Sequence, residues 1–257
     1  MILLLGGTSD APPIALCLAE AGYRVLVSQA TDVPLETPLH RNIEARSGPL
    51  DERSLTELVD NQGVRAIVDA THPYAVAAHA AAGRVADQKG IPCLRFLRPA
   101  AVAEAAPGVE LVADHAAAAV AAFRRGRPVL LTTGTRNLRP YVEQARRTGL
   151  KLVVRVLDHA QSLNACRQAG IRPEEVIAGR GPFSVDDNRR HVRACGAGVL
   201  VTKDSGAAGG TAEKLQAAQT EGCDVIVIAR PALGNRQGFT EIDAILTALA
   251  HALAARG

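Results

Sequence analysis

Short apolar runs alternate with longer segments whose apolar positions recur at helical spacing. In the first half, this pattern predicts strands at 2–5, 24–28, 65–70 and 91–96, and helices at 12–21, 51–62 and 74–89. In the second half, it predicts strands at 109–112, 128–133, 151–157, 175–178, 198–202 and 224–229, and helices at 114–125, 138–148, 159–169, 185–195, 211–221 and 241–255. Such alternation is typical of α/β proteins with parallel sheets.

The alternation pauses once, at residues 99–108, which are mostly small and include proline. We therefore expect an α/β protein with two Rossmann-like domains, 1–98 and 99–257, each a mostly parallel sheet flanked by helices. The active-site cleft is expected between the domains, because ligand sites concentrate at domain interfaces. The last helix, at 241–255, could pack on either domain. Residues 30–50 are interpreted as a long loop rich in Pro and charge.

Composition and charge restrict the classes of partner and location that are expected. The chain has 257 residues, of which 47% are hydrophobic and 21% charged, and its net charge of +3 is too small to indicate a nucleic-acid partner. Most basic residues are arginines, which favour carboxylates and phosphates, so an acidic small molecule is the expected partner. The five cysteines are scattered, which predicts a reducing cytosolic location and no protein-bound metal. No stretch is long and apolar enough to predict a membrane span.

Candidate chemistry lies at the predicted strand ends, where parallel sheets bind ligands. The first strand runs into Gly6, Gly7, Thr8, Ser9 and Asp10. Such a turn has room for the pyrophosphate of a dinucleotide, although it lacks the full Gly-x-Gly-x-x-Gly spacing. The alternative is a tight turn in which Ser9 or Asp10 caps the next helix.

The second strand ends at Ser28, where ribose recognition is usual, and Asp32 follows in the loop. An acidic residue there favours the 2′-hydroxyl of NADH, whereas a nearby arginine favours the 2′-phosphate of NADPH. With Asp32 present and no arginine next to Ser28 in the sequence, the pattern tilts toward NADH. The alternative is that Asp32 only forms the turn.

Thr71 and His72 join a buried strand to an Ala-rich helix. His72 could act as an acid, a base or a hydrogen-bond donor to the cofactor. The alternative is structural: Thr71 caps the helix, Pro73 occupies its first turn, and His72 bonds to local backbone.

In the second half, Arg180 stands between two glycines in the stretch Gly179 to Phe183, where it could grip an acidic group; the alternative is a kinked exit turn. Lys203 begins a second stretch, which reaches Gly206 and could cradle carboxylates. Lys203 could also donate a proton if it is desolvated. The alternative is a flexible loop with a solvated Lys–Asp pair.

No nucleophile elbow, metal-ligand cluster, phosphate-binding loop of the NTPase type or aromatic stacking platform occurs in the sequence. What remains is an enzyme for a nicotinamide cofactor and an acidic substrate, with no flavin expected. Two alternatives stay open: an NAD(P)-dependent oxidoreductase on a two-lobed scaffold that acts on some other acidic metabolite, or a carrier that binds a nucleotide or a labile intermediate without catalysis.

Seven motifs occur in an order that resembles the precorrin-6A reductase family of cobalamin biosynthesis. They are Gly6-Gly7-Thr8-Ser9-Asp10-Ala11, Asp69-Ala70-Thr71-His72-Pro73-Tyr74-Ala75, Leu131-Thr132-Thr133-Gly134, Arg155-Val156-Leu157, Arg180-Gly181-Pro182-Phe183-Ser184, Thr202-Lys203-Asp204-Ser205-Gly206 and Ile228-Ala229-Arg230-Pro231. The resemblance implies that hydride from a nicotinamide cofactor reduces a carbon–carbon double bond of a macrocycle, with protonation at the other carbon.

The resemblance also assigns roles. It implies that Gly6 to Asp10 and the loop after Ser28 hold the cofactor. It implies that Arg180 to Phe183 and Lys203 to Gly206 face either a tetrapyrrole with acidic side chains or the nicotinamide side of the cleft. The substrate-binding candidates are Thr133, Gly134, Arg180, Gly181, Pro182, Phe183, Lys203, Ser205 and Gly206. Local spellings such as Gly181-Pro182-Phe183-Ser184 are similar to the anaerobic branch, which reduces cobalt-precorrin-6A with NADH, rather than to the oxygen-dependent branch, which uses NADPH.

Overall fold

The computed structural model describes residues 1–30, 38–99, 108–206, 209–231 and 238–255. Its contacts divide the chain into two compact units. The first unit comprises Met1–Pro99 and Pro231–Gly257, and the second comprises Ala100–Arg230. The expected division at residue 98/99 must therefore be corrected at the C-terminal end, because the segment from Pro231 onward belongs to the first unit.

The first unit is built on one sheet with the strand order β12-β5-β4-β1-β2-β3. Its strands are β1 (Ile2–Leu5), β2 (Val25–Gln29), β3 (Ile43–Ser47), β4 (Ala66–Asp69), β5 (Cys93–Phe96) and β12 (Gly238–Phe239). All pairings in it are parallel. The order reverses between β1 and β4, and open α/β sheets bind ligands at such a switch point.

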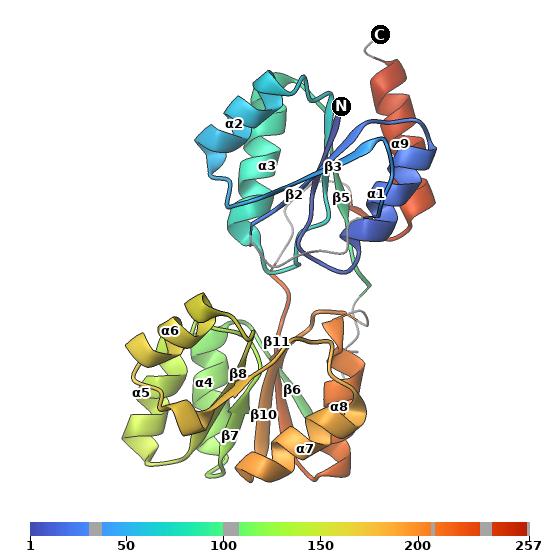
Figure 1. The fold of residues 1–257 in the computed structure, drawn as a ribbon. Helices are drawn as coiled ribbons and strands as arrows, with labels where there is room; N and C mark the ends of the chain where they lie inside the picture. Colours follow the sequence, from blue (N-terminus) through green and yellow to red (C-terminus); the bar gives the residue numbers. More distant parts are fainter. Residues whose placement is uncertain (31–37, 100–107, 207–208, 232–237, 256–257) are drawn as a thin grey trace. The chain divides into compact units, whose positions relative to one another are not determined.

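Helices cover both faces of this sheet, as Figure 1 shows. The helices are α1 (Ala11–Glu20), α2 (Glu52–Asn61), α3 (Val76–Lys89) and α9 (Ile242–Ala254). Alternate residues of β1 point to opposite faces. Ile2 and Leu4 are buried with apolar residues of α1 and α9, whereas Leu3 and Leu5 are buried with those of α2 and α3. This double burial explains why β1 is apolar throughout.

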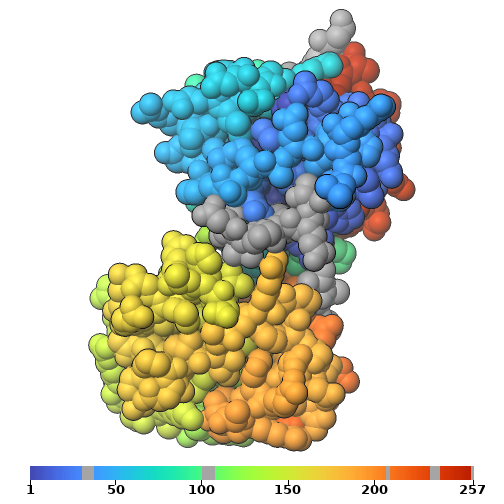
Figure 2. Space-filling model, viewed as in Figure 1, coloured from blue at the N-terminus to red at the C-terminus, as the bar shows by residue number. Residues whose placement is uncertain are grey.

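Helix α9 packs on the first unit, which decides the placement that the sequence leaves open. Ile245, Leu249 and Leu253 join the core formed by β1 and α1. In Figures 1 and 2 the red C-terminal helix accordingly lies beside the blue N-terminal elements.

The second unit repeats the same architecture, with the strand order β6-β11-β10-β7-β8-β9. Its strands are β6 (Val109–Val112), β7 (Val129–Leu131), β8 (Leu152–Val156), β9 (Val176–Ala178), β10 (Val199–Lys203) and β11 (Asp224–Ile228). Its helices are α4 (His115–Arg124), α5 (Arg139–Thr148), α6 (Ala160–Gln168), α7 (Val185–Cys195) and α8 (Thr211–Thr220), with a short 3₁₀ turn at Pro173–Glu175. The pairings are again parallel, and the switch point lies between β7 and β10.

Two strands fall where the sequence pattern predicts no strand. Strand β3 occupies part of the presumed loop at 30–50 and pairs with β2 over its whole length. It is an edge strand whose residues are exposed or half-buried, so it lacks the apolar run that identifies a buried strand. Strand β12 is only two residues long and pairs with β5.

Candidate active site

The turn between β1 and α1 is tight and is fastened to β4. A Cβ atom on Gly6 would lie 2.9 Å from the Cβ of Ala11, so only glycine lets the strand and the helix approach this closely. Gly7 has a φ of +101°, a backbone conformation that glycine adopts without strain, and the space beside it is open. The buried Thr8 hydroxyl donates to the carbonyl of Ala70, 3.0 Å away. The turn therefore places backbone that carries no side chain, at Gly6 and Gly7, beside the switch point of the first sheet.

Asp10 occupies the N-cap position of α1, but its side chain forms no cap. Its carboxylate instead accepts from Arg98 Nε at 2.8 Å and Nη2 at 2.6 Å, and Arg98 Nη2 also donates to Ser9 Oγ at 3.3 Å. Arg98 is only 7% exposed. The expectation that Ser9 or Asp10 caps the helix is therefore wrong, because Arg98 engages both side chains. Arg98 also neutralises a carboxylate that would repel a phosphate at this turn.

Arg46 lies beside Ser28. The two residues are register partners on β3 and β2. Arg46 Nη1 donates to the buried Ser28 Oγ at 2.7 Å. Ser28 has no arginine next to it in the sequence, but the unpredicted strand β3 brings Arg46 to its side in the fold. Asp32, on which the NADH expectation also rests, lies outside the described residues.

The end of β4 carries a buried ionic network around Asp69, which is fully buried. Its carboxylate lies 2.7 Å from His79 Nδ1 and 3.1 Å from Arg95 Nε. It also accepts from the backbone N–H and the hydroxyl of Thr71, at 3.1 and 2.7 Å. Burial alone would raise the pKa of Asp69, but the hydrogen bonds from His79 and Thr71 and the charge of Arg95 hold it below its ordinary value.

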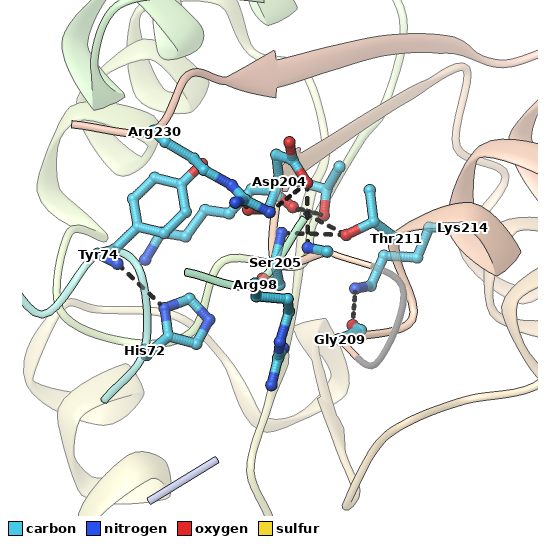
Figure 3. Close-up of polar contacts among 12 residues, drawn as sticks. His72, Tyr74, Arg98, Asp204, Ser205, Gly209, Thr211, Lys214 and Arg230 are labelled. Atoms are coloured by element: carbon cyan, nitrogen blue, oxygen red, sulfur yellow. Dashed lines mark hydrogen bonds and ion pairs between the residues drawn. The ribbon is translucent and has the colours of Figure 1, made fainter. Parts of the chain in front are cut away.

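This network positions the following loop. The hydroxyl of Thr71 is committed to Asp69, and the N-cap of α3 is Ala75, so the alternative in which Thr71 caps the helix is wrong. His72 is half-buried, and its Nδ1 accepts from the backbone N–H of Tyr74 at 3.3 Å (Figure 3). His72 thus lies at the carboxyl end of β4, next to the switch point of the first sheet.

In the second unit, Lys203 connects the two strands of the switch point. It ends β10, and its Nζ donates to the carbonyl of Thr133, just after β7, at 3.1 Å. Burial and the charge of Arg136 lower the pKa of Lys203. Thr133 Oγ1 is buried and has no hydrogen-bond partner among the described residues. The next residue, Gly134, has a φ of +79°.

The turn after β10 is ordered by polar contacts that Figure 3 shows. Asp204 is 5% exposed and accepts from Arg230 Nη2 at 3.2 Å and from the N–H of Gly206 at 3.0 Å. The N–H of Ser205 donates to the hydroxyl of Thr211 at 3.1 Å. Asp204 is therefore not solvated, as the alternative of a solvated Lys–Asp pair requires, but is buried and forms an ion pair with Arg230.

A second basic residue, Arg155, lies under the loop after β9. It is 5% exposed, and its Nη1 donates to Asn188 Oδ1 at 2.7 Å. Its guanidinium carbon lies 4.3 Å from the centroid of the Phe183 ring. Burial lowers the pKa of Arg155 to about 10, and no carboxylate of the described residues forms an ion pair with it.

The glycines around Arg180 make room for Phe183. A Cβ atom on Gly179 or Gly181 would lie 3.0 or 3.3 Å from the Phe183 ring. Arg180 itself is exposed. Pro182, in the same loop, lies against Gly210, where its Cβ would be 3.5 Å from an added Cβ. The loops after β9 and β10 therefore meet.

Lys214 is a buried cation of this unit, as Arg155 is. It is 9% exposed, and its Nζ donates to the carbonyl of Gly209 at 3.0 Å, as Figure 3 shows. Burial and the charge of Arg155 lower the pKa of Lys214 to about 8, while Glu213 acts in the opposite direction. Neither Lys214 nor Arg155 forms an ion pair in the described part of the chain. Two buried positive charges therefore lie close to the loops that follow β9 and β10.

Sequence analysis does not single out four basic residues near the carboxyl ends of the strands as site residues. They are Arg46, Arg98, Arg155 and Lys214. Arg46 and Arg98 are each recognised only through a partner far away in the sequence. Arg155 and Lys214 are recognised through burial without a counter-ion, although Arg155 belongs to one of the quoted motifs.

Three further observations concern the rest of the described residues. The described residues contain no group of three or more His, Cys, Asp or Glu side chains arranged to hold a metal ion. None of their helices is long and apolar enough to cross a membrane. A cavity of about 430 Å³ lies between α5 and the start of β8, at the opposite end of the strands from the residues described above.

The comparison with protein families decides the assignment. The family model described as "Precorrin-6x reductase CbiJ/CobK" matches residues 1–250. The chain belongs to the precorrin-6x reductase family. The resemblance inferred from the seven motifs is thereby confirmed, and so is the class of enzyme, an oxidoreductase of cobalamin biosynthesis that acts on a CH–CH group.

Individual relatives agree with this assignment. The chain is 32% identical over 250 residues to the cobalt-precorrin-6A reductase of Priestia megaterium, covering 97% of this chain and 98% of the relative. It is 34% identical to that of Salmonella typhimurium, covering 90% and 87%. It is 30% identical to the precorrin-6A reductase of Rhodobacter capsulatus, covering 100% and 98%.

A solved structure supports the fold. The structure of the CobK precorrin-6A reductase matches with a TM-score of 0.78 and 28% identity, covering 97% of this chain and 96% of that one. The predicted fold class, two parallel sheets flanked by helices, is confirmed.

Proposed function

We propose that this precorrin-6x reductase reduces one carbon–carbon double bond of the cobalt-precorrin-6A macrocycle with NADPH or NADH as hydride donor. The observation that carries the proposal is the family match over residues 1–250. Relatives named for the cobalt-containing and for the metal-free substrate both align over most of the chain. The local sequence at 181–184 favours the cobalt form.

The carboxyl ends of the strands in the first unit suit a dinucleotide. The close approach at Gly6, the open space beside the left-handed Gly7 and the neutralised Asp10 leave room for a phosphate at a switch point. Pro12 and Pro13 have no N–H, so the loop amides, rather than the first turn of α1, would bind the pyrophosphate. We assign Gly6, Gly7, Thr8, Ser9, Asp10, Ser28, Thr71 and His72 to this site, and Asp32 remains a sequence prediction. The nicotinamide supplies the hydride when it is bound.

The carboxyl ends of the strands in the second unit, with the loops that follow them, suit an acidic ligand. Arg155, Lys203 and Lys214 are partly or fully buried cations, and a carboxylate of the substrate would offset the cost of burying them. The unpartnered hydroxyl of Thr133 gives one further polar contact. Gly134, Arg180, Gly181, Pro182, Phe183, Ser205 and Gly206 complete the proposed surface for the macrocycle.

Lys203 is our candidate for the proton that reduction requires. It ends a strand of the switch point, is held by the carbonyl of Thr133, and has a lowered pKa, so its ammonium gives up a proton more readily than an exposed lysine does. Hydride addition at one carbon and proton transfer to the other complete the reduction. The macrocycle delocalises charge during the reaction, so the protein mainly orients its ligands and stabilises their charges.

The test is turnover of cobalt-precorrin-6A and of precorrin-6A with each nicotinamide cofactor. We expect oxidation of the cofactor only when a macrocycle is present. Lys203→Met should lower kcat by about tenfold to a thousandfold. The control is Lys151→Met, which removes an exposed lysine that also donates to a backbone carbonyl. If the protein binds the macrocycle but never oxidises the cofactor, it is a carrier. If Lys203→Met keeps the rate and its pH dependence, Lys203 is not the proton donor.

A further inference from the structure

His191, on helix α7, faces Arg155 of strand β8. Helix α7 begins with a capping box formed by Ser184 and Asp187. Asn188 and His191 lie three positions apart within this helix, so they share one of its faces. Arg155 precedes them by 33 and 36 positions in the sequence. The fold therefore brings two side chains of α7 to one guanidinium.

Both protons of Arg155 Nη1 have acceptors on α7. Nη1 donates to Asn188 Oδ1 at 2.7 Å and to His191 Nδ1 at 3.2 Å. Because an arginine only donates, His191 Nδ1 is the acceptor, and the ring is a neutral imidazole with its proton on Nε2. Asn188 is buried, and its Nδ2 donates to the carbonyls of Phe183 and Ser184 at 3.1 and 2.8 Å, which fixes the direction of its oxygen.

The flat face of the guanidinium packs on Phe183. The guanidinium carbon of Arg155 lies 4.3 Å from the centroid of that ring, a cation–π contact. The ring of Phe183 in turn meets the imidazole of His191 edge to face, with 5.2 Å between the centroids and 78° between the planes. His191 therefore holds Arg155 directly through Nδ1 and indirectly through the ring of Phe183.

These contacts leave another edge of the guanidinium for a ligand. Among the described residues, the hydrogen bonds of Arg155 start from Nη1, and no carboxylate forms an ion pair with it. The N–H groups of Nε and Nη2 are adjacent donors along the remaining edge. A carboxylate binds such an edge through two parallel hydrogen bonds.

The charges around His191 support its neutral form. Burial lowers the pKa of His191, and the charges of Arg155 and Arg190 lower it further, whereas Asp187 acts in the opposite direction. Lys214, on α8, adds a second positive charge that interacts with Arg155. A proton on Nδ1 would remove the acceptor of Nη1 and bring another positive charge into this cluster.

We propose that His191 is a positioning residue that, as a neutral acceptor on Arg155 Nη1, aims the Nε–Nη2 edge of Arg155 at a carboxylate of the macrocycle. Asn188 holds the same nitrogen, and Phe183 supports the face of the guanidinium. The proposal rests on the macrocycle surface proposed above and deepens it, because it says which edge of a buried arginine receives the substrate. A histidine that only filled space would need no acceptor nitrogen.

Nuclear magnetic resonance of the protein without ligands tests the orientation of Arg155 by His191. Long-range ¹H–¹⁵N spectra distinguish the two tautomers of a histidine ring. We expect the ring of His191 to carry its proton on Nε2 at pH 8 and to titrate below 6.5. Arg155→Met should raise the titration midpoint toward 6.5, because a positive charge is removed while the burial remains. A proton on Nδ1 at pH 8, or a midpoint that Arg155→Met leaves unchanged, would overturn the proposal.

Steady-state kinetics with cobalt-precorrin-6A test the consequence for the substrate. His191→Leu should raise KM about threefold to tenfold, the loss expected for one hydrogen bond between protein groups. It should leave kcat within about twofold, because the carboxylate is bound alike in the ground state and the transition state. His191→Asn should recover most of the affinity, since its Oδ1 can accept from Nη1 in place of Nδ1.

The matched control is His251→Leu, which removes an exposed histidine from helix α9 of the first unit and should change neither constant. Normal turnover with an unchanged KM in His191→Leu, or an Asn variant that binds no better than the Leu variant, overturns the role of His191 alone. A wild-type protein that neither binds nor reduces the macrocycle overturns the proposed function, and the role of His191 fails with it.

Discussion

The substitution Lys214→Met should make the protein more stable at pH 7 while it weakens binding of the acidic substrate. Lys214 is 9% exposed, and its described hydrogen bond is to the carbonyl of Gly209. Burial and the charge of Arg155 lower its pKa from 10.5 to about 8. The fold therefore holds an ammonium in a place that disfavours its charge.

The magnitude follows from that pKa. Each tenfold change in proton affinity is worth about 1.4 kcal/mol, so holding the charged form costs about 3 kcal/mol at pH 7. Loss of the hydrogen bond to Gly209 offsets about 1 kcal/mol of the gain. We expect Lys214→Met to raise the free energy of unfolding by about 2 kcal/mol, which for a chain of this size raises Tm by about 4–8 °C.

The pH dependence has a defined sign. The pKa of Lys214 is lower in the folded state, so between about pH 8 and 10.5 the unfolded chain holds more protons. The contribution of Lys214 therefore makes the wild-type protein more stable as pH rises through that range. The variant lacks this contribution, and its advantage should shrink toward pH 10.

Urea unfolding followed by circular dichroism from pH 6 to pH 10 measures both effects. Lys151→Met serves as the control, because Lys151 is an exposed lysine of the same unit. A Lys214→Met protein that is less stable than wild type at pH 7, with an unchanged pH dependence, would refute the reasoning. Greater stability together with an affinity for the macrocycle at least about tenfold lower would indicate that the buried charge serves binding at the expense of stability.

Three further predictions concern the first unit. Arg98→Met should lower dinucleotide affinity by about tenfold or more in calorimetric titration, because Asp10 is left unneutralised beside the phosphates; unchanged affinity would place the cofactor elsewhere. Asp69→Asn should destabilise the protein by about 3–5 kcal/mol at pH 7 in urea unfolding, because its buried arginine partner loses its counter-charge. The stabilisation from the ionised Asp69 is complete above the unfolded pKa of 3.8 and is lost as pH falls through its lower folded pKa, so only the wild-type protein should show that loss. Gly6→Ala should cost about 1–3 kcal/mol and weaken dinucleotide binding, because its Cβ would press on Ala11; a fully stable variant would show that the helix shifts freely.

Much of the fold is predictable from sequence because buried parallel strands and the helices that cover them have distinct apolar patterns. The helix at 185–195 and the strand at 109–112 agree with the structure to the residue. Strand β3 is missed because an exposed edge strand buries few apolar side chains. Ile43, at its start, is not followed by a run of apolar residues that would predict a buried strand. The placement of the C-terminal helix stays open in the sequence, because the apolar pattern does not reveal on which sheet a helix packs.

Candidate residues such as Gly7 and Lys203 can be picked out from sequence, because each belongs to a short glycine-containing stretch at the end of a strand. Arg46 and Arg98 cannot, because their partners lie 18 and 88 positions away in the sequence. Arg46 reaches Ser28 through pairing of β2 with β3, and Arg98 reaches Asp10 because the loops after β5 and β1 meet in the fold; a local sequence pattern indicates neither contact. The missed strand and the missed arginine have one cause, since Arg46 lies on β3.

Transfer of deuterium from a nicotinamide cofactor labelled at C4 tests the central claim most directly. The purified protein would be incubated with cobalt-precorrin-6A and each C4-deuterated epimer of NADPH, and the product analysed by mass spectrometry. The family assignment and the proposed site predict that one epimer transfers its deuterium to a carbon of the macrocycle, with matching oxidation of the cofactor. Binding of both molecules with no label in the macrocycle and no cofactor oxidation would contradict a reductase and indicate a carrier.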